Sequence, residues 1–145
     1  MSNQPIAVRN PNSTRPYQHV LEPLFAYLMI AALQYEDSSY SGYYNVGPDE
    51  ADCVTTGELA DLFCQSWSGA RWVNLAEKNA PHEANFLKLD CSLLKARFGW
   101  HTTWSVTDAI EKTVEWSQAW LAGDDVAAAH IVLNSLESVA FAKAV

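Results

Sequence analysis

Helix start and stop signals recur along the chain, and they constrain its fold more than any other feature of the sequence. Thr55 and Glu58 form a Thr-x-x-Glu capping box, which predicts that a helix begins here. Gly69 suits the left-handed residue that stops such a helix. The apolar stripe predicted on this helix comprises Leu59, Leu62, Phe63 and Trp67.

Two further helices are predicted on either side of this one. Pro23 suits a first helical turn, and the helix that it opens should run to about Glu36. A short helix capped by Asp90 or Ser92 should end at Phe98. The residues that we expect the first of these helices to bury are Leu24, Tyr27, Leu28, Ala31 and Tyr35.

The last third of the sequence predicts two more helices. Ser105 begins the longer one, which stops at Gly123, and Asp124 caps a final Ala-rich segment. The residues of the longer helix that are available for packing are Ala109, Ile110, Thr113, Val114, Trp116 and Trp120.

Short strands are predicted between the helices, at residues 5–10, 17–21, 43–46 and 71–75. Residues 10–16, NPNSTRP, have the composition of a turn-rich link. Strands and helices that alternate in this way favour an α/β fold with four or five helices. No internal repeat and no long linker divides the sequence, so residues 1–145 are predicted to form a single unit.

Composition and charge narrow the class of protein. Hydrophobic residues make up 49% of the 145 residues and charged residues 18%, which is typical of a globular protein. The formal net charge is −8, and no cluster of Lys and Arg interrupts it. This balance argues against nucleic-acid binding, although one or two arginines can still hold a small anionic ligand.

Cysteine content and apolar runs bear on the compartment. Cys53, Cys64 and Cys91 are odd in number and form no C-x-x-C motif, which argues against a disulfide framework or a zinc site. Residues 1–14 lack the apolar core of a signal peptide, and the apolar run at residues 24–33 is too short to span a bilayer. These features favour a soluble, cytoplasmic protein with reduced thiols.

The stretch RPYQHVLEPL, residues 15–24, carries the polar side chains Arg15, Gln18 and His19 directly before a predicted buried helix. It fits either a surface strand that enters a helix or one wall of a ligand site. His82 and Glu83 raise the same choice in a polar hinge, between a solvated loop and a functional pair. The sequence has no P-loop, no nucleophile elbow and no His-Glu-x-x-His motif to decide between these alternatives.

A resemblance to a known family favours the ligand site. VRNPNSTRPYQHVLEPL, YNVGPDEAD, VTTGELADLFCQSW, PHEANFLKLDCSLLKARFGW and AIEKTVEWSQAWLAGDD follow one another in the order found in CDP-glucose 4,6-dehydratases. These enzymes belong to the extended short-chain dehydrogenase/reductase superfamily. The resemblance runs from about Pro5 to Asp125 and fades in the Ala-rich tail. It implies a helix-rich and incomplete Rossmann-type α/β fold, the C-terminal substrate-binding portion of such an enzyme.

Two motifs of that superfamily are missing from the chain. The glycine-rich G-x-x-G-x-x-G turn that seats NAD has no counterpart, and no tyrosine is followed by a lysine four residues later. In the family, this Tyr–Lys pair handles the proton at the sugar 4-hydroxyl while NAD takes the hydride. The resemblance therefore implies that NAD serves the full-length enzymes, whereas this chain alone binds no cofactor and carries no catalytic residue.

The resemblance also implies a site and three classes of function. It places Arg15 in the cleft that holds the nucleotide-sugar, with Gln18 on the same wall and with His82 and Glu83 in a loop lining that cleft. That loop lacks the family's arginine, because position 80 is Ala. The chain is then the substrate-binding portion of a CDP-glucose 4,6-dehydratase, a non-catalytic module that binds nucleotide-sugars, or an interaction or remnant protein. CDP-glucose or a related nucleotide-sugar is the expected ligand, and a separate Rossmann half or a second copy is a further candidate partner.

Overall fold

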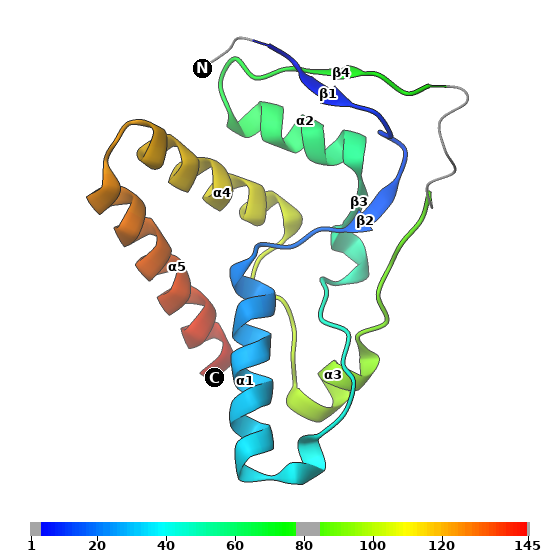
Figure 1. Cartoon of the computed structure of the whole chain (residues 1–145), viewed down its shortest axis with the longest axis vertical. Helices are drawn as coiled ribbons and strands as arrows, with labels where there is room; N and C mark the ends of the chain where they lie inside the picture. The colour runs from blue at the N-terminus through cyan, green and yellow to red at the C-terminus, as the bar shows by residue number, and fades with distance from the viewer. Residues whose placement is uncertain (1–3, 78–84, 145) are drawn as a thin grey trace.

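The computed structural model describes residues 4–77 and 85–144, with side chains as far as residue 140 (Figure 1). These residues contain five α-helices and four short strands, with three helices in succession at the end of the chain and 3-10 turns at Ser38–Tyr40 and Glu50–Asp52. The elements are β1 Ile6–Val8, β2 Thr14–Pro16, α1 Leu21–Glu36, β3 Cys53–Thr55, α2 Thr56–Ser66, β4 Trp72–Asn74, α3 Ser92–Phe98, α4 Val106–Leu121 and α5 Asp125–Ala144.

The strands form two separate ribbons of two strands each. β1 pairs in parallel with β4, so that Ala7 lies opposite Val73. β2 pairs antiparallel with β3, so that Arg15 lies opposite Val54. Among the described residues no sheet is wider than two strands. The chain is therefore a helix-rich, incomplete α/β structure, as the resemblance predicted.

Helix α2 packs against the parallel ribbon and confirms its predicted start. The Thr55 hydroxyl accepts a hydrogen bond from the Glu58 N–H, and the Glu58 carboxylate accepts one from the Thr55 N–H. In the first turn, a Cβ on Gly57 would lie 3.1 Å from the carbonyl oxygen of Pro11, so the helix approaches the β1–β2 link more closely than other residues allow. The Trp72 indole of β4 donates to Asp61 at 2.7 Å and ties the ribbon to the helix.

The buried face of α1 differs from the predicted one. Leu28 is 71% exposed and Tyr35 is 93% exposed, whereas Glu22 and Ala26 are fully buried. The residues predicted to be buried are all exposed, and they comprise Leu24, Tyr27, Leu28, Ala31 and Tyr35. The prediction was wrong because α1 is apolar around most of its circumference, so its sequence does not mark which face meets the core.

Two strand predictions were also wrong. Residues 17–21 and 43–46 form no strand. The strand that follows β1 is instead β2, which lies inside the segment predicted as a turn-rich link. Strand β3 was not predicted at all. A strand of three residues depends on its partner strand, and the paired residues of β2 and β3 are separated by 36 intervening residues or more. By contrast, β1 and β4 lie within the predicted segments 5–10 and 71–75.

The remaining helices end where their signals predicted. Gly99 closes α3 with a left-handed φ of 63°, and Gly123 follows α4 with a φ of 75°. Ser105 caps α4 in a second capping box, and the Asp124 carboxylate accepts from the Ala127 N–H in the first turn of α5. On α4 the predicted packing residues divide: Ala109 and Val114 are buried, Ile110 is half-buried, and Thr113, Trp116 and Trp120 are exposed.

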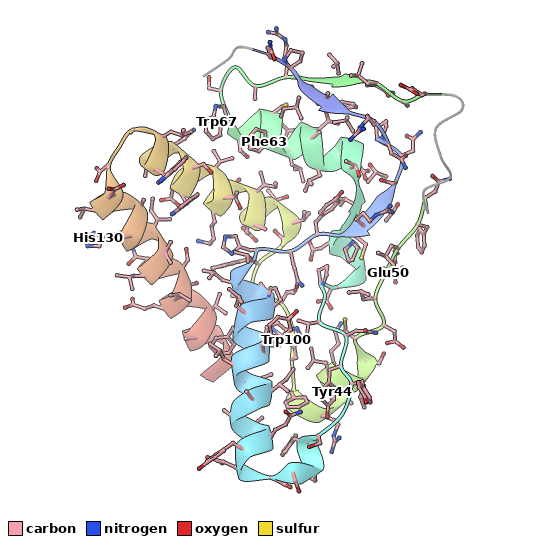
Figure 2. All side chains as sticks on the ribbon, viewed as in Figure 1. Tyr44, Glu50, Phe63, Trp67, Trp100 and His130 are labelled. Carbon is pink, nitrogen blue, oxygen red and sulfur yellow. The ribbon has the colours of Figure 1, made fainter. Side chains whose placement is uncertain are left out.

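The core lies between α1 and α3. Ala26, Leu94 and Trp100 are buried together, and Tyr44 packs against them from the segment that leads to β3. Figure 2 shows Trp100 and Tyr44 in the space between these two helices. Within the described residues, none of the helices has the length and hydropathy needed to cross a bilayer.

Candidate ligand-binding site

Arg15 is held on a strand that has neighbours on both sides. Its backbone pairs with Val54 of β3, and the adjacent Thr14 receives the chain that returns as residues 85–87. The Thr14 N–H donates to the Asn85 carbonyl at 2.9 Å, and the Leu87 N–H donates to the Thr14 carbonyl at 3.1 Å. The half-buried Arg15 side chain donates from Nη1 to that same carbonyl at 2.9 Å. The structure thus holds Arg15 on the central one of three adjacent segments.

Gln18 is turned toward a different segment. Its Nε2 donates to the Val46 carbonyl at 3.3 Å. Its Oε1 is buried and accepts no hydrogen bond from the part of the chain that the structure describes. A buried amide oxygen without a donor loses hydration that nothing replaces, so Oε1 is an unsatisfied acceptor among the described residues. Arg15 and Gln18 therefore lie on one stretch, although their hydrogen bonds named here go to different segments.

His82 and Glu83 lie outside the described residues, so their predicted place in the cleft stays a prediction. The structure describes the chain again from Asn85 onward. Asn85 hydrogen-bonds to Thr14, one residue before Arg15. Asn85, the first described residue after position 84, therefore lies beside the strand that carries the candidate arginine.

A polar cavity of about 390 Å³ adjoins the same ribbon, because Cys53, which pairs with Pro16, is part of its lining. Two lysines also line it. Lys88 Nζ lies 2.5 Å from the carboxylate of Glu50, which Figure 2 labels, and Lys95 forms an ion pair with Asp49. The sequence analysis missed both lysines, because their partners are 38 and 46 residues away and leave no local pattern.

The groups around this cavity are suited to binding more than to catalysis. Burial raises the pKa of the Cys53 and Cys91 thiols, so both stay protonated and are poor nucleophiles. The hydrogen bond from Lys95 to Asp49 raises the pKa of that lysine and keeps it charged. No cluster of three metal-ligating side chains exists in residues 4–77 and 85–144.

At the starts of α2 and α4, the first backbone N–H groups are not free to bind the pyrophosphate of a dinucleotide such as NAD. In dinucleotide-binding folds, the pyrophosphate rests on backbone N–H groups that point outward at a helix N-terminus. At α2 the Thr56 and Gly57 N–H groups donate to the carbonyls of Ser13 and Pro11 at 2.9 and 2.8 Å, and the Thr55 hydroxyl takes the next N–H. At α4 the Val106 N–H donates to Asp52 at 2.8 Å. These donors are already used within the chain.

His19 belongs to a different part of the molecule from Arg15. Its ring meets the edge of Trp104 with the centroids 4.9 Å apart, and it lines a second cavity with residues of α4 and α5. Burial and, to a smaller extent, Lys112 lower the pKa of His19, so the ring is neutral near pH 7. The stretch RPYQHVLEPL thus serves two surfaces, the β2 ribbon through Arg15 and the helical region through His19.

Comparison with known proteins finds similarity to an enzyme that is much longer than this chain. No family model matches the chain. A CDP-glucose 4,6-dehydratase of Salmonella typhimurium (strain LT2) is 41% identical over 127 residues, which cover 86% of this chain and 35% of that enzyme. The chain therefore spans about a third of the length of the curated relative it matches. This partial coverage fits the C-terminal portion that the motifs of the sequence predicted, and the chain is a relative of CDP-glucose 4,6-dehydratase.

Proposed function

We propose that this chain is the C-terminal, substrate-binding portion of a CDP-glucose 4,6-dehydratase-like protein and that it binds CDP-glucose or a related nucleotide-sugar. The observation that carries the proposal is the 41% identity over 86% of the chain. The geometry supports it, because β2 holds Arg15 between β3 and residues 85–87.

Each proposed site residue has a binding role. The Arg15 guanidinium offers a rigid fork of donors, which suits two oxygens of a pyrophosphate or ribose. The buried Oε1 of Gln18 accepts a hydrogen bond from a sugar hydroxyl or a base amino group. In the loop, His82 and Glu83 supply a neutral group and an acceptor for the sugar or the base. Together these residues bind and orient the ligand.

Chemistry is assigned to another part of the full-length enzymes. In the family, CDP-glucose is dehydrated to the 4-keto-6-deoxy sugar, and NAD supplies the hydride transfer when bound. This sequence has neither the glycine-rich turn nor the Tyr-x-x-x-Lys pair, and the first backbone N–H groups of α2 and α4 are not free to bind the cofactor's pyrophosphate. We therefore expect the isolated chain to form no keto product.

A second candidate is an interaction role, in which α1 docks against another polypeptide. The exposed apolar face of α1 favours it, since Leu28 and Tyr35 are among the most exposed large side chains of the described residues. A separate Rossmann half and a second copy of the chain are the partners considered for this role. A non-catalytic module that binds nucleotide-sugars is the third alternative.

Calorimetric titration of CDP-glucose into the purified chain tests the proposal. The Arg15→Ala variant should bind about 1.5–3 kcal/mol more weakly, the usual contribution of a charge-assisted hydrogen bond. Arg15→Lys should recover only part, because an ammonium group cannot reproduce the two-pronged contact. Arg9→Ala is the matched control, because Arg9 is exposed and lies just beyond β1.

His82→Ala should cost less, about 0.5–1.5 kcal/mol, if its ring makes one neutral hydrogen bond. Thermal melts of each variant separate lost binding from lost folding. Equal affinity for wild type and Arg15→Ala would remove Arg15 from the site. No heat of binding at all would favour the interaction role, which gel filtration of the chain alone then tests for self-association.

A further inference from the structure

A second cavity of about 290 Å³ lies among the start of α1, the middle of α4 and the middle of α5. Figure 1 shows α4 and α5 as a helical hairpin whose open end faces α1. Ligand cavities commonly occur between packed helices, and this one is at the small end of their usual range of about 300–1,000 Å³. Most of its lining is apolar, and these residues are Val20, Leu21, Trp116, Ile131 and Val132.

Two nitrogen donors meet on one side of this cavity. Lys112 places its Nζ 4.8 Å from the centre of the Trp104 ring, and His19 contacts the edge of the same ring. The Leu21 N–H donates to Nδ1 of His19 at 3.3 Å, which assigns the ring proton to Nε2. Lys112 and His19 therefore both line the cavity as donors, held in place by a shared indole.

The charge at this place is a single ammonium. Lys112 is the one lysine or arginine among the lining residues, and His19 is neutral. Asp108, one turn earlier on α4, interacts electrostatically with Lys112, but its carboxylate already accepts a hydrogen bond from the Ser105 hydroxyl. The hydroxyl of Thr113 donates a hydrogen bond to the Ala109 carbonyl at 2.7 Å within the helix, so it has no proton left to donate to a ligand. The cavity thus combines an apolar lining with two hydrogen-bond donors, Lys112 and His19, which suit a ligand that carries an acceptor.

We propose that this cavity binds a small molecule with an apolar body and one carboxylate, which Lys112 and His19 hold. A carboxylate forms strong charge-assisted hydrogen bonds with an ammonium, and its single negative charge matches the single positive charge of Lys112. The apolar lining favours an aryl or alkyl body. The site shares no lining residue with the cavity beside β2 and β3, so it does not rest on nucleotide-sugar binding. Its α5 side also lies beyond Asp125, where the resemblance to the dehydratases fades.

Two probes of the same size test the proposal. We would titrate 4-phenylbutyrate and its uncharged amide into the full chain, and follow binding by calorimetry and by backbone amide chemical shifts. The acid should bind with a dissociation constant of about 1 mM or tighter, as ligands of this size allow. It should bind about ten- to a hundredfold more tightly than the amide, the contribution of a charged hydrogen bond.

Two variants separate the apolar and charged parts of the site. Val132→Trp should fill the cavity from its 36% exposed position and abolish binding of both probes. Lys112→Met keeps the apolar stem of the side chain and should remove the preference for the acid. Lys88→Met is the matched control, since Lys88 pairs with Glu50 in the other cavity and should leave both affinities unchanged.

The outcomes are decisive even if one variant folds poorly. Shift changes that cluster on α4 and α5 around Lys112 in the wild-type chain support the site without any substitution. Absence of binding by the acid up to about ten times the expected dissociation constant would overturn the proposal. Equal affinities of acid and amide in the wild type, or undiminished binding by a folded Val132→Trp variant, would overturn it as well.

Discussion

Helices α1 and α4 are each 16 residues long, but their sequences specify them to different degrees. Helix α4 begins at a complete capping box of Ser105 and Asp108, where it was predicted to begin. Helix α1 follows Val20, which makes no side-chain cap, and it is apolar on nearly every side. The sequence alone therefore located both helices, but α1 has no counterpart of the capping box that begins α4.

What holds α1 in place comes from a distant part of the chain. The fully buried Glu22 accepts hydrogen bonds at Oε1 from the backbone N–H groups of Thr103 and Trp104, at 2.7 and 3.0 Å. These two residues directly precede the cap of α4. The Glu22 carboxylate, in the first turn of α1, therefore holds α1 against the segment that leads into α4.

The largest effect is expected at this carboxylate. Glu22→Ala should lower the free energy of unfolding by about 3 kcal/mol, because it leaves two backbone N–H groups in the protein interior without their acceptor. Glu22→Gln retains one carbonyl oxygen and should cost less. Urea denaturation followed by circular dichroism measures both values.

Glu36→Ala is the control for this change, because Glu36 is exposed at the other end of the same helix. It should change stability by no more than about 0.5 kcal/mol. If Glu22→Ala were as stable as Glu36→Ala, the link between α1 and the start of α4 would be wrong.

The next effect tests which face of α1 is buried. Ala26 is fully buried and Ala31 is exposed, so one substitution at two positions compares the two faces. Ala26→Leu should cost about 1–3 kcal/mol, because the added carbons do not fit beside Leu94 and Trp100. Ala31→Leu should lie within about 0.5 kcal/mol of the wild type.

Thermal melts of the two leucine variants provide the measurement. If the face predicted from the sequence were the buried one, Ala31→Leu would be the more destabilising of the two substitutions. Finding that order would restore the sequence-based face and contradict the structure.

The smallest effect concerns the capping box of α4. Ser105→Ala should cost about 1 kcal/mol at neutral pH, the typical value of an N-cap. Hydrogen bonds from the Ser105 side chain and backbone lower the pKa of the Asp108 carboxyl. A carboxyl with a lowered pKa stabilises the folded state above its unfolded pKa, and this stabilisation is lost as the pH falls through the folded pKa.

The cost of Ser105→Ala should therefore shrink as the pH falls from the ordinary Asp value of 3.8 through the lowered pKa of Asp108, below which this carboxyl is protonated in both variants. Unfolding curves at pH 7 and at acidic pH values down to about 2.5 test this dependence. Ser117→Ala, on the same helix but away from the cap, should show no comparable dependence. A cost of Ser105→Ala that is independent of pH would show that the carboxylate does not contribute through this hydroxyl.

Much of the candidate site could be predicted only through the resemblance. Arg15 was singled out by its motif, and the structure adds that a strand paired on β3 holds it. His19 was noticed as a polar residue before a helix, but nothing local indicated that it lies against Trp104, 85 positions later. Lys88 and Lys95 were missed for the same reason, because ion pairs between distant residues follow no period in the sequence.

The sequence by itself determined where α2 and α4 begin and where α3 ends, because caps and left-handed glycines act within three or four residues of each other. Ser105 bonds to Asp108, and Gly99 ends α3 through the Lys95 carbonyl. Only the tertiary structure decided which face of α1 is buried and which three-residue segments pair as strands. An apolar helix has several faces of similar hydrophobicity, and a short strand has no stability without a partner, so both depend on segments that only folding brings together.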